Sequence, residues 1–298
     1  MHPMAISPQP QDPASWPTGS AEQLEPLVRR VLAPNASPFT YTGTQTYIVG
    51  GDEGLAVIDP GPADDDHLAA LQSAIGEATV CAIMCTHTHR DHSPAAAPLA
   101  KATGAPIVGC APLHLHSDAP RVDAPFDQDY APDRVMEHGE AMTGPGWTLR
   151  AVATPGHTSN HLCFALEETG AVFTGDHVMG WSTSVVVPPD GDMADYMASL
   201  HLLYEREQDR IYYPAHGPAV EKPRQLVRGM IGHRRQRERQ ILRLLGEEAR
   251  SIAALVPVMY KGVHEKLWPA AGQSVFAHLL DLERRGEVQR SGDVWQAN

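Results

Sequence analysis

Four side chains that can bind a metal ion lie close together in the segment from Thr86 to His92, namely His87, His89, Asp91 and His92. Residues 79–85, just before them, are small and apolar, which predicts a buried strand. Imidazole nitrogens and carboxylate oxygens are ligands of zinc and similar cations. Side chains alternate along an extended chain, so His87 and His89 point to the same side. A turn after them would direct Asp91 and His92 toward a second metal position. The segment therefore predicts a site for two metal ions.

Four more apolar segments predict strands that end in a residue of the same kind. Asp59 follows 55–58, His157 follows 147–153, Asp176 follows 171–174 and His216 follows 210–213. Taken alone, Asp59 is more typical of a turn cap. Strand ends and the loops after them gather at one edge of a sheet, where sites are built. The five strand ends together therefore favour one shared site.

The elements that would position these residues are strands and helices between residues 21 and 221. Residues 21–32 are interpreted as a short helix or amphipathic lead-in, and 40–50 with 55–58 as a β-hairpin. Helices are predicted over 63–75, 94–103 and 195–207. Residues 111–134 predict a long surface loop, which is either a lid beside a site or irregular surface.

The composition indicates one large domain followed by a small one. The chain has 298 residues and 42% hydrophobic content, and no apolar run approaches the ~20 residues that span a bilayer. Residues 1–20 are rich in proline and lack the pattern of a secretion signal, so we expect a disordered tail and a cytoplasmic protein with no membrane partner. The four cysteines lie in apolar contexts without a CxxC pair, as reduced core cysteines do.

Charge divides the chain near residue 222. The net charge is −13, but residues 222–298 hold 14 Lys and Arg against 8 Asp and Glu, or +6, which leaves −19 on residues 1–221. An acidic first unit argues against broad attraction to nucleic acid there, whereas the basic second unit leaves that question open. We therefore predict a disordered tail at 1–20, a catalytic domain at 21–221, and a basic linker helix and small domain at 222–298.

The motifs and their order resemble the metallo-β-lactamase superfamily over roughly residues 40–220. The matching segments are 57–61, 86–92, 155–157, 174–176 and 214–217. This resemblance implies an α/β fold, specifically an αββα sandwich of two packed sheets with helices outside. It implies that His87, His89 and His157 hold one metal, that Asp91, His92 and His216 hold the other, that Asp176 bridges the two, and that Asp59 supports the ligands.

Such a site would make the chain a binuclear hydrolase. A water shared by two divalent cations loses a proton near neutral pH, which supplies a metal-bridging hydroxide as the nucleophile. Zinc suits the nitrogen and oxygen donors, with manganese or iron as alternatives. Asp91 is the candidate for moving the proton, and Asp59 assists as a second catalytic residue. His161 is interpreted either as a substrate contact or as a supporting histidine, and His177 as support rather than a ligand.

Residues 191–200, 213–218 and 233–242 are similar to the β-lactamase-like protein 2 group of this superfamily. That group contains a single-strand endoribonuclease and fungal polyketide thioesterases, so the resemblance implies either kind of substrate. We expect a small-molecule acyl substrate, such as an ester, thioester, lactone or lactam, because an acidic metal domain is a poor partner for RNA phosphates. Cleavage of single-stranded RNA is the alternative.

The C-terminal module is predicted to contain three helices and a hairpin. The helices span 224–249, 252–260 and 274–285, and the hairpin spans 288–295. This order resembles a winged helix, as in the group named above. The third helix carries charges of both signs, so it is not a clear recognition helix. We expect a module that shapes the pocket or forms a homodimer; the alternative is a nucleic-acid-binding regulator with a non-catalytic metal domain.

Overall fold

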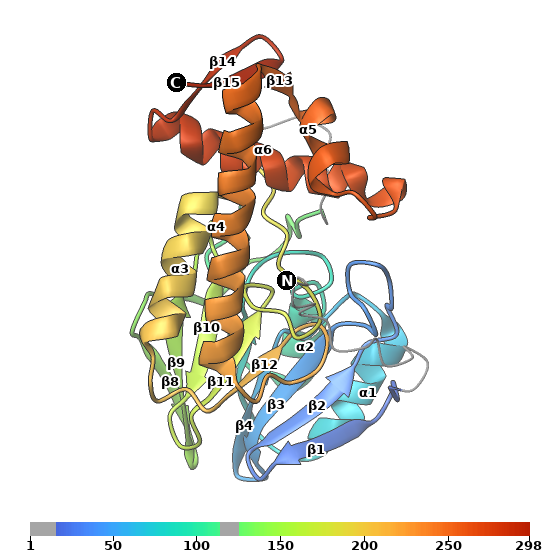
Figure 1. Cartoon of the computed structure of the whole chain (residues 1–298). Helices are drawn as coiled ribbons and strands as arrows, with labels where there is room; N and C mark the ends of the chain where they lie inside the picture. The colour runs from blue at the N-terminus through green and yellow to red at the C-terminus, as the bar shows by residue number, and fades with distance from the viewer. Residues whose placement is uncertain (1–15, 114–124) are drawn as a thin grey trace.

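The computed structural model describes residues 16–113 and 125–298, so most of the predicted tail lies outside the described residues. Two β-sheets pack face to face with helices on both outer faces, and a mostly helical module follows (Figure 1). This arrangement confirms the αββα sandwich and the winged-helix-like end that the sequence predicts. Within the described ranges, no helix is both long and apolar enough to cross a membrane.

The first sheet has seven strands and the second has five, and in both sheets strands that are consecutive in the sequence are neighbours. The first contains β1 (Ala21–Glu25), β2 (Val28–Leu32), β3 (Gln45–Gly51), β4 (Gly54–Ile58), β5 (Val80–Cys85), β6 (Ile107–Gly109) and β7 (Arg134–Val135). The second contains β8 (Ala141–Gly144), β9 (Trp147–Ala153), β10 (Leu162–Leu166), β11 (Ala171–Gly175) and β12 (Ile211–Pro214). A third, small sheet contains β13 (Arg250–Ser251), β14 (Val288–Ser291) and β15 (Val294–Ala297).

The helices cover the sheets and build the module. They are α1 (Asp65–Ile75), α2 (Ala96–Thr103), α3 (Met193–Glu205), α4 (Pro223–Glu247), α5 (Ile252–Met259), the 3-10 turn η2 (Glu265–Leu267) and α6 (Trp268–Arg284). Asp64 and Asp192 cap α1 and α3, because their carboxylates accept hydrogen bonds from the first free backbone N–H groups. Gly104 ends α2 in the left-handed conformation that glycine tolerates. Helix α6 begins earlier than predicted, with Pro269 in its first turn, where the missing N–H is not needed.

The expectation of a helix over residues 21–32 is wrong. These residues form β1 and β2, an antiparallel pair that extends the sheet, with Val31 opposite Thr46 of β3. Val28 and Val31 are buried three positions apart, a spacing that resembles a helical face. The free edge of β3 favours a strand here, because pairing with β3 gives the backbone N–H and C=O groups of β2 hydrogen-bond partners and buries both valines.

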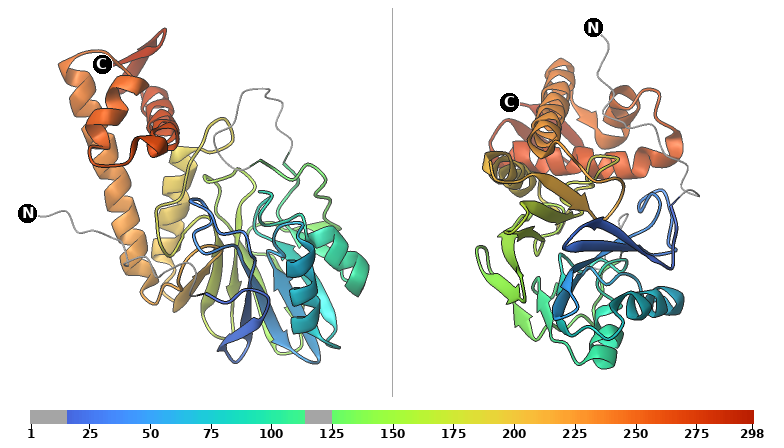
Figure 2. Two further views of the ribbon diagram at one scale, coloured as in Figure 1. Left: turned by 90° about the vertical axis from the view of Figure 1, so that its right-hand side faces the viewer. Right: turned by 90° about the horizontal axis from the view of Figure 1, so that it is seen from below.

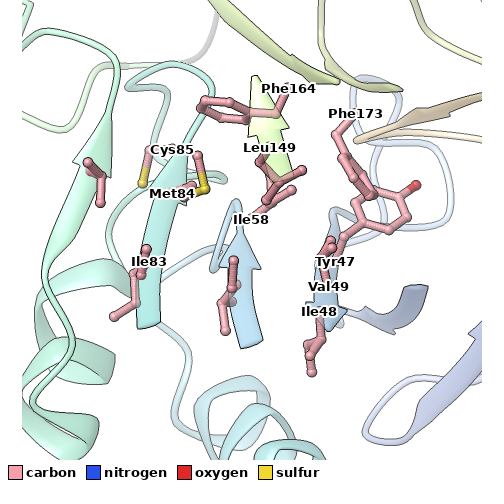
Figure 3. Close-up of a cluster of buried hydrophobic side chains, with 14 of the residues drawn as sticks. Tyr47, Ile48, Val49, Ile58, Ile83, Met84, Cys85, Leu149, Phe164 and Phe173 are labelled. Atoms are coloured by element: carbon pink, nitrogen blue, oxygen red, sulfur yellow. The ribbon is translucent and has the colours of Figure 1, made fainter. Parts of the chain in front are cut away.

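The main core lies between the two sheets. Figure 3 shows Tyr47 of β3 pointing toward Phe173 of the second sheet, while its neighbour Ile48 points the other way. The rings of Tyr47 and Phe173 have centroids 5.0 Å apart. Met84 and Leu149 are fully buried in the same cluster. Burying aliphatic and aromatic side chains of this size contributes roughly 1.5–3 kcal/mol each, which fixes the strands whose ends carry the site.

Helix α4 joins the sandwich to the module (Figure 2). Val227 and Met230, in its first half, pack with α3 and with Ala277 of α6. Ile241 and Leu244, in its second half, pack with α5 and α6. The boundary predicted at residue 221 stays a prediction, because this one helix contributes to the cores on both sides.

Candidate metal centre

Sheet topology brings the predicted ligands to one edge of the sandwich. Strands β4 and β5 are parallel, so Asp59 and His87 follow strand ends that lie side by side. In the other sheet β11 is parallel to β12 and antiparallel to β10, which is antiparallel to β9. The ends of β9, β11 and β12 therefore share one edge, and His157, Asp176 and His216 follow them.

The first group of donors is made of three histidines. Nε2 of His87 lies 3.0 Å from Nδ1 of His89, and Nε2 of His157 lies 3.2 Å from the same atom. Nitrogen ligands about 2.0–2.1 Å from a tetrahedral zinc lie about 3.3 Å from one another. The three ring nitrogens therefore have the spacing of ligands to one small cation.

The second group pairs a carboxylate with two histidines. Oδ2 of Asp91 lies 3.3 Å from Nε2 of His92 and 3.2 Å from Nε2 of His216. The hydroxyl of Thr44 also donates a hydrogen bond to this carboxylate, at 3.1 Å. Asp91 is thus held in place by groups from three different segments of the chain.

Asp176 lies between the two groups. Its Oδ2 is 3.6 Å from Nε2 of His157 and 3.6 Å from Nε2 of His92. Its Oδ1 is 3.3 Å from Nε2 of His216. The carboxylate therefore faces ring nitrogens of both groups, which is the position a bridging ligand needs.

The remaining nitrogen of four of these histidines is fixed by a protein oxygen. Nδ1 of His157 donates to the carbonyl of Val185 at 2.6 Å, Nδ1 of His216 to the carbonyl of Gly43 at 3.2 Å, and Nδ1 of His92 to Asp59 at 3.0 Å. Nδ1 of His87 lies 3.0 Å from the Thr86 hydroxyl. Contacts of this kind fix the tautomer, because they place hydrogen on Nδ1 and leave Nε2 free to bind a metal.

Asp59 supports the centre rather than entering it. Its carboxylate accepts hydrogen bonds from the Thr86 N–H at 2.7 Å, from the Thr86 hydroxyl at 2.8 Å and from His92. The residue has φ of +48°, a left-handed conformation that Asp and Asn tolerate better than most residues. Asp59 therefore contacts His92 through Nδ1 and leaves Nε2 of that ring facing the other donors.

Electrostatics divide the histidines into two kinds. Burial is the main reason that the pKa of His87 lies well below its usual value, and neighbouring histidines lower it further. Burial would also lower the pKa of His216, but Asp176 and Asp91 beside it raise that pKa to about 10. Burial would raise the pKa of Asp91, yet His92 and His216 hold it well below the usual range. In the metal-free site His87 is thus neutral and Asp91 ionised, the forms that bind cations, whereas His216 is protonated at neutral pH and must release a proton when a cation binds.

The buried donors fit a pair of divalent ions. Nε2 of His92 and Oδ1 of Asp176 are buried and make no hydrogen bond within the described chain. Their nearest polar neighbours are other donors of the same site, at 3.3 Å, and a cation between the two groups would give both atoms a well-directed partner. The donors are nitrogen and oxygen only, a set that suits zinc, manganese or iron.

His161 and His177 lie behind the ligands. Nε2 of His161 accepts a hydrogen bond from the Asp176 N–H at 3.2 Å, and Nδ1 lies 2.9 Å from the Thr154 hydroxyl. Its side chain is 1% exposed and is not among the residues that line the cavity above the centre. This geometry favours the supporting role over substrate contact. His177 is fully buried against the ring of Tyr196.

A cavity of about 350 Å³ opens above the centre. Its floor includes His89, Asp91, His157, Asp176 and His216, and its walls include Ser37, Phe39, Thr40, Arg90, Pro125, Met179 and Val185. Pro125 comes from the predicted loop at 111–134, so the described part of that loop borders the site; residues 114–124 lie outside the described chain. Described residues of the C-terminal module do not line the cavity.

The sequence does not predict five of the wall residues, namely Ser37, Phe39, Thr40, Met179 and Val185. They have no metal-binding side chains and no periodic pattern, so only the position of Phe39 and Met179 near the ligands in space identifies them. The carbonyls of Gly43 and Val185 cannot be predicted from the sequence either, because every residue carries a backbone carbonyl. A weak signal existed at Phe126, an isolated aromatic residue that stacks on His89 with ring centroids 4.6 Å apart.

Comparison with known proteins identifies the family of each domain. The metallo-β-lactamase superfamily matches residues 40–216, and the β-lactamase-associated winged helix domain matches residues 251–295. The chain belongs to the metallo-β-lactamase superfamily and is a hydrolase with a C-terminal winged helix.

Two relatives and one solved structure illustrate the similarity. The chain is 34% identical over 278 residues to the β-lactamase-like protein 2 homolog of Drosophila melanogaster, covering 90% of this chain and 92% of that protein. It is 33% identical over 231 residues to the atrochrysone carboxyl ACP thioesterase of a Cryptosporiopsis species, covering 77% and 66%. The crystal structure of a β-lactamase domain protein from Burkholderia ambifaria has a TM-score of 0.78 at 19% identity over 94% of each chain, which shows the same fold.

Proposed function

We propose that this protein is a binuclear zinc hydrolase that cleaves an acyl substrate, namely a thioester or a related ester, lactone or lactam. The observation that carries the proposal is the convergence of seven donor side chains beneath a cavity with largely apolar walls. His87, His89 and His157 would hold one ion, Asp91, His92 and His216 the other, and Asp176 would bridge them. Manganese or iron would suit the same donors.

Bound divalent ions would lower the pKa of a shared water and polarise the scissile carbonyl. The chain's own residues supply the rest. Asp91 lies on the cavity floor and is ionised, so it can accept the proton that such a water releases and pass it to the leaving group. Asp59 keeps His92 oriented through its Nδ1. Thr44 holds the Asp91 carboxylate through a hydrogen bond, so the proton acceptor stays in one position.

The cavity walls support an acyl substrate. Phe39, Pro125, Met179 and Val185 offer carbon surface beside the carbonyl-binding position, and small-molecule sites are typically apolar with a few polar groups. The catalytic unit is acidic, which disfavours a polyanionic substrate. Relatives named as thioesterases act on acyl groups joined to sulfur, and the same bond class is proposed here.

Single-stranded RNA is the second candidate, favoured by one surface feature. Five exposed arginines recur along α4 at helical spacing and so share one face: Arg224, Arg228, Arg235, Arg239 and Arg243. Such a face attracts phosphates. It lies on the helix rather than in the cavity, so it ranks behind the apolar walls as evidence about the substrate.

We also propose a cytoplasmic location. All four cysteines are free thiols, and three of them are buried. Free thiols persist in a reducing compartment, whereas secreted proteins tend to form disulfides.

The substrate classes can be separated with one set of assays. Protein freed of metal and reloaded with zinc would be given an acyl thioester, an aryl ester, a lactone, a cephalosporin and a single-stranded RNA oligonucleotide. We expect thioester hydrolysis that an Asp91→Asn variant loses. RNA cleavage that Asp91→Asn abolishes, without acyl hydrolysis, would reverse the order of the two candidates. A zinc-loaded chain that cleaves none of these bonds would refute the proposal.

A further inference from the structure

Arg234 is a buried arginine at the meeting point of the sandwich and the C-terminal module. It lies in α4, and its side chain is 3% exposed. In the described part of the chain it forms no ion pair with a carboxylate, and its Nε has no hydrogen-bond partner. Burying a charge without a counter-charge is costly, so the contacts that Arg234 does make must outweigh a large desolvation penalty.

Those contacts join three separate elements. Nη2 donates a hydrogen bond to the carbonyl of Ser184, in the segment between β11 and α3. Nη1 donates to the hydroxyl of Ser274 on α6 at 3.1 Å. The guanidinium lies over the ring of Tyr196 on α3, 5.1 Å from its centroid. A planar guanidinium with several fixed donors suits such a junction better than a single ammonium group.

The segment that Arg234 holds is the one that orients a metal ligand. The carbonyl of Val185, the residue after Ser184, accepts the hydrogen bond from Nδ1 of His157 at 2.6 Å. The hydroxyls of Ser184 and Tyr196 both donate to the carbonyl of His177, at 2.8 and 3.1 Å. Arg234 therefore sits one residue from the oxygen that fixes the ring of His157.

A second connection runs between the module and the same ligand. Arg284, at the end of α6, forms an ion pair with Asp192 at 2.8 Å. The N–H of Asp192 donates to the carbonyl of Gly156, the residue before His157, at 2.9 Å. Gly156 has φ of +132°, and a Cβ there would lie 2.3 Å from the backbone of Tyr196, so the ligand loop packs tightly against α3. The C-terminal module is thus connected to the surroundings of His157 twice, through Arg234 and through Arg284.

We infer that Arg234 is a positioning residue through which the winged-helix module holds His157 in place for metal binding. The module then contributes to the site without lining the cavity. This inference rests on the proposed metal centre. Groups behind a ligating histidine typically change metal affinity 10- to 100-fold when they are lost.

The test compares two arginines on the same helix. Arg237 is a matched control, because it also donates to a carbonyl, that of Met259 at 2.8 Å, and lies over a ring, that of Tyr260, but entirely within the module. The full-length wild type, Arg234→Met and Arg237→Met proteins, freed of metal, would be titrated with zinc against a chromophoric chelator. Circular dichroism and thermal unfolding of the metal-free proteins would report on folding.

We expect Arg234→Met to raise the Kd for one of the two zinc ions about 10-fold. In Arg237→Met, the Kd values for both zinc ions should stay within twofold of wild type. Both substitutions should lower the unfolding temperature, so stability alone cannot produce the difference. Folded Arg234→Met that binds both zinc ions like wild type would overturn the inference.

Should Arg234→Met fail to fold, Arg234→Lys decides in its place. This variant keeps the buried charge but loses the forked donors. A higher Kd for one zinc ion in Arg234→Lys supports the inference, and Kd values equal to those of wild type overturn it. A wild-type chain that binds no zinc overturns the metal centre as well, so failure of the proposed function and failure of this inference can be told apart.

Discussion

The carboxylate of Asp59 lies 3.0 Å from Nδ1 of His92 and accepts two further hydrogen bonds from Thr86. This one residue therefore ties the end of β4 to the loop after β5, where most of the ligands lie. It also determines which nitrogen of His92 faces the metal position. The relationship explains why an aspartate occupies a turn position with positive φ.

Asp59→Asn should weaken metal binding about 10- to 100-fold while the backbone stays unstrained, since Asn also tolerates positive φ. The amide has one acceptor oxygen, so it cannot satisfy the three donors that the carboxylate satisfies now. Zinc titration measures the effect. Asp133→Asn is the control, because Asp133 accepts a hydrogen bond from the Ile107 N–H, away from the metal-binding side chains. Equal zinc affinity in wild type and Asp59→Asn would show that Asp59 does not orient a ligand.

Asp91→Asn should lower kcat by a factor on the order of 10²–10⁴, the range typical of losing a general acid or base. It should also lower the affinity for one of the two zinc ions, because His92 and His216 then lack the carboxylate between them. Steady-state kinetics and metal content measured on the same preparation check both effects. Full activity in a folded Asp91→Asn protein would remove Asp91 from the mechanism.

The ligand set is predictable from the sequence for a physical reason. Each candidate donor follows an apolar strand, and parallel strand ends meet at one edge of a sheet, so the pattern places Asp59 beside His87 in one sheet and Asp176 beside His216 in the other. The walls are not predictable in this way, because Phe39 and Val185 reach the cavity through irregular segments without a period. Nor is the carbonyl partner of His157. The β1–β2 pair differs from the expected helix because only the free edge of β3, a tertiary feature, selects strand over helix there.

Phe39 lines the cavity and is 51% exposed, so it should gain burial when an acyl chain binds. Phe39→Ala should raise KM for long acyl substrates roughly 10-fold, which corresponds to about 1.4 kcal/mol of lost apolar burial, with kcat little changed. Short acyl substrates should be affected less. Val135→Ala is the control, because Val135 is 43% exposed but does not line the cavity. A KM that is independent of chain length in both proteins would exclude Phe39 from the substrate site.

His278 should make the stability of the protein depend on pH. Burial is the main cause that lowers its pKa to about 3, and Arg234 nearby lowers it further. A histidine near 6.5 in the unfolded chain then binds protons before the folded one does, so its stabilising contribution is full above pH 6.5 and is lost as pH falls toward 3. At pH 5 the loss from this residue is about 2 kcal/mol.

Urea unfolding of the metal-free protein at pH 7 and pH 5 measures this effect. In His278→Leu, the difference in unfolding free energy between the two pH values should shrink by about 2 kcal/mol. Groups that titrate elsewhere, including the metal ligands, are shared by both proteins and cancel in the comparison. An identical pH dependence in wild type and His278→Leu would show that His278 titrates alike in the folded and unfolded chains.

Metal content tests the central claim most directly. The protein would be purified without chelators, reloaded with zinc, desalted and analysed by atomic emission, with circular dichroism on the same sample. Two groups of donors joined by Asp176 predict about two zinc ions per chain, and fewer in an Asp176→Asn variant. A correctly folded wild-type chain that retains no metal would contradict the account.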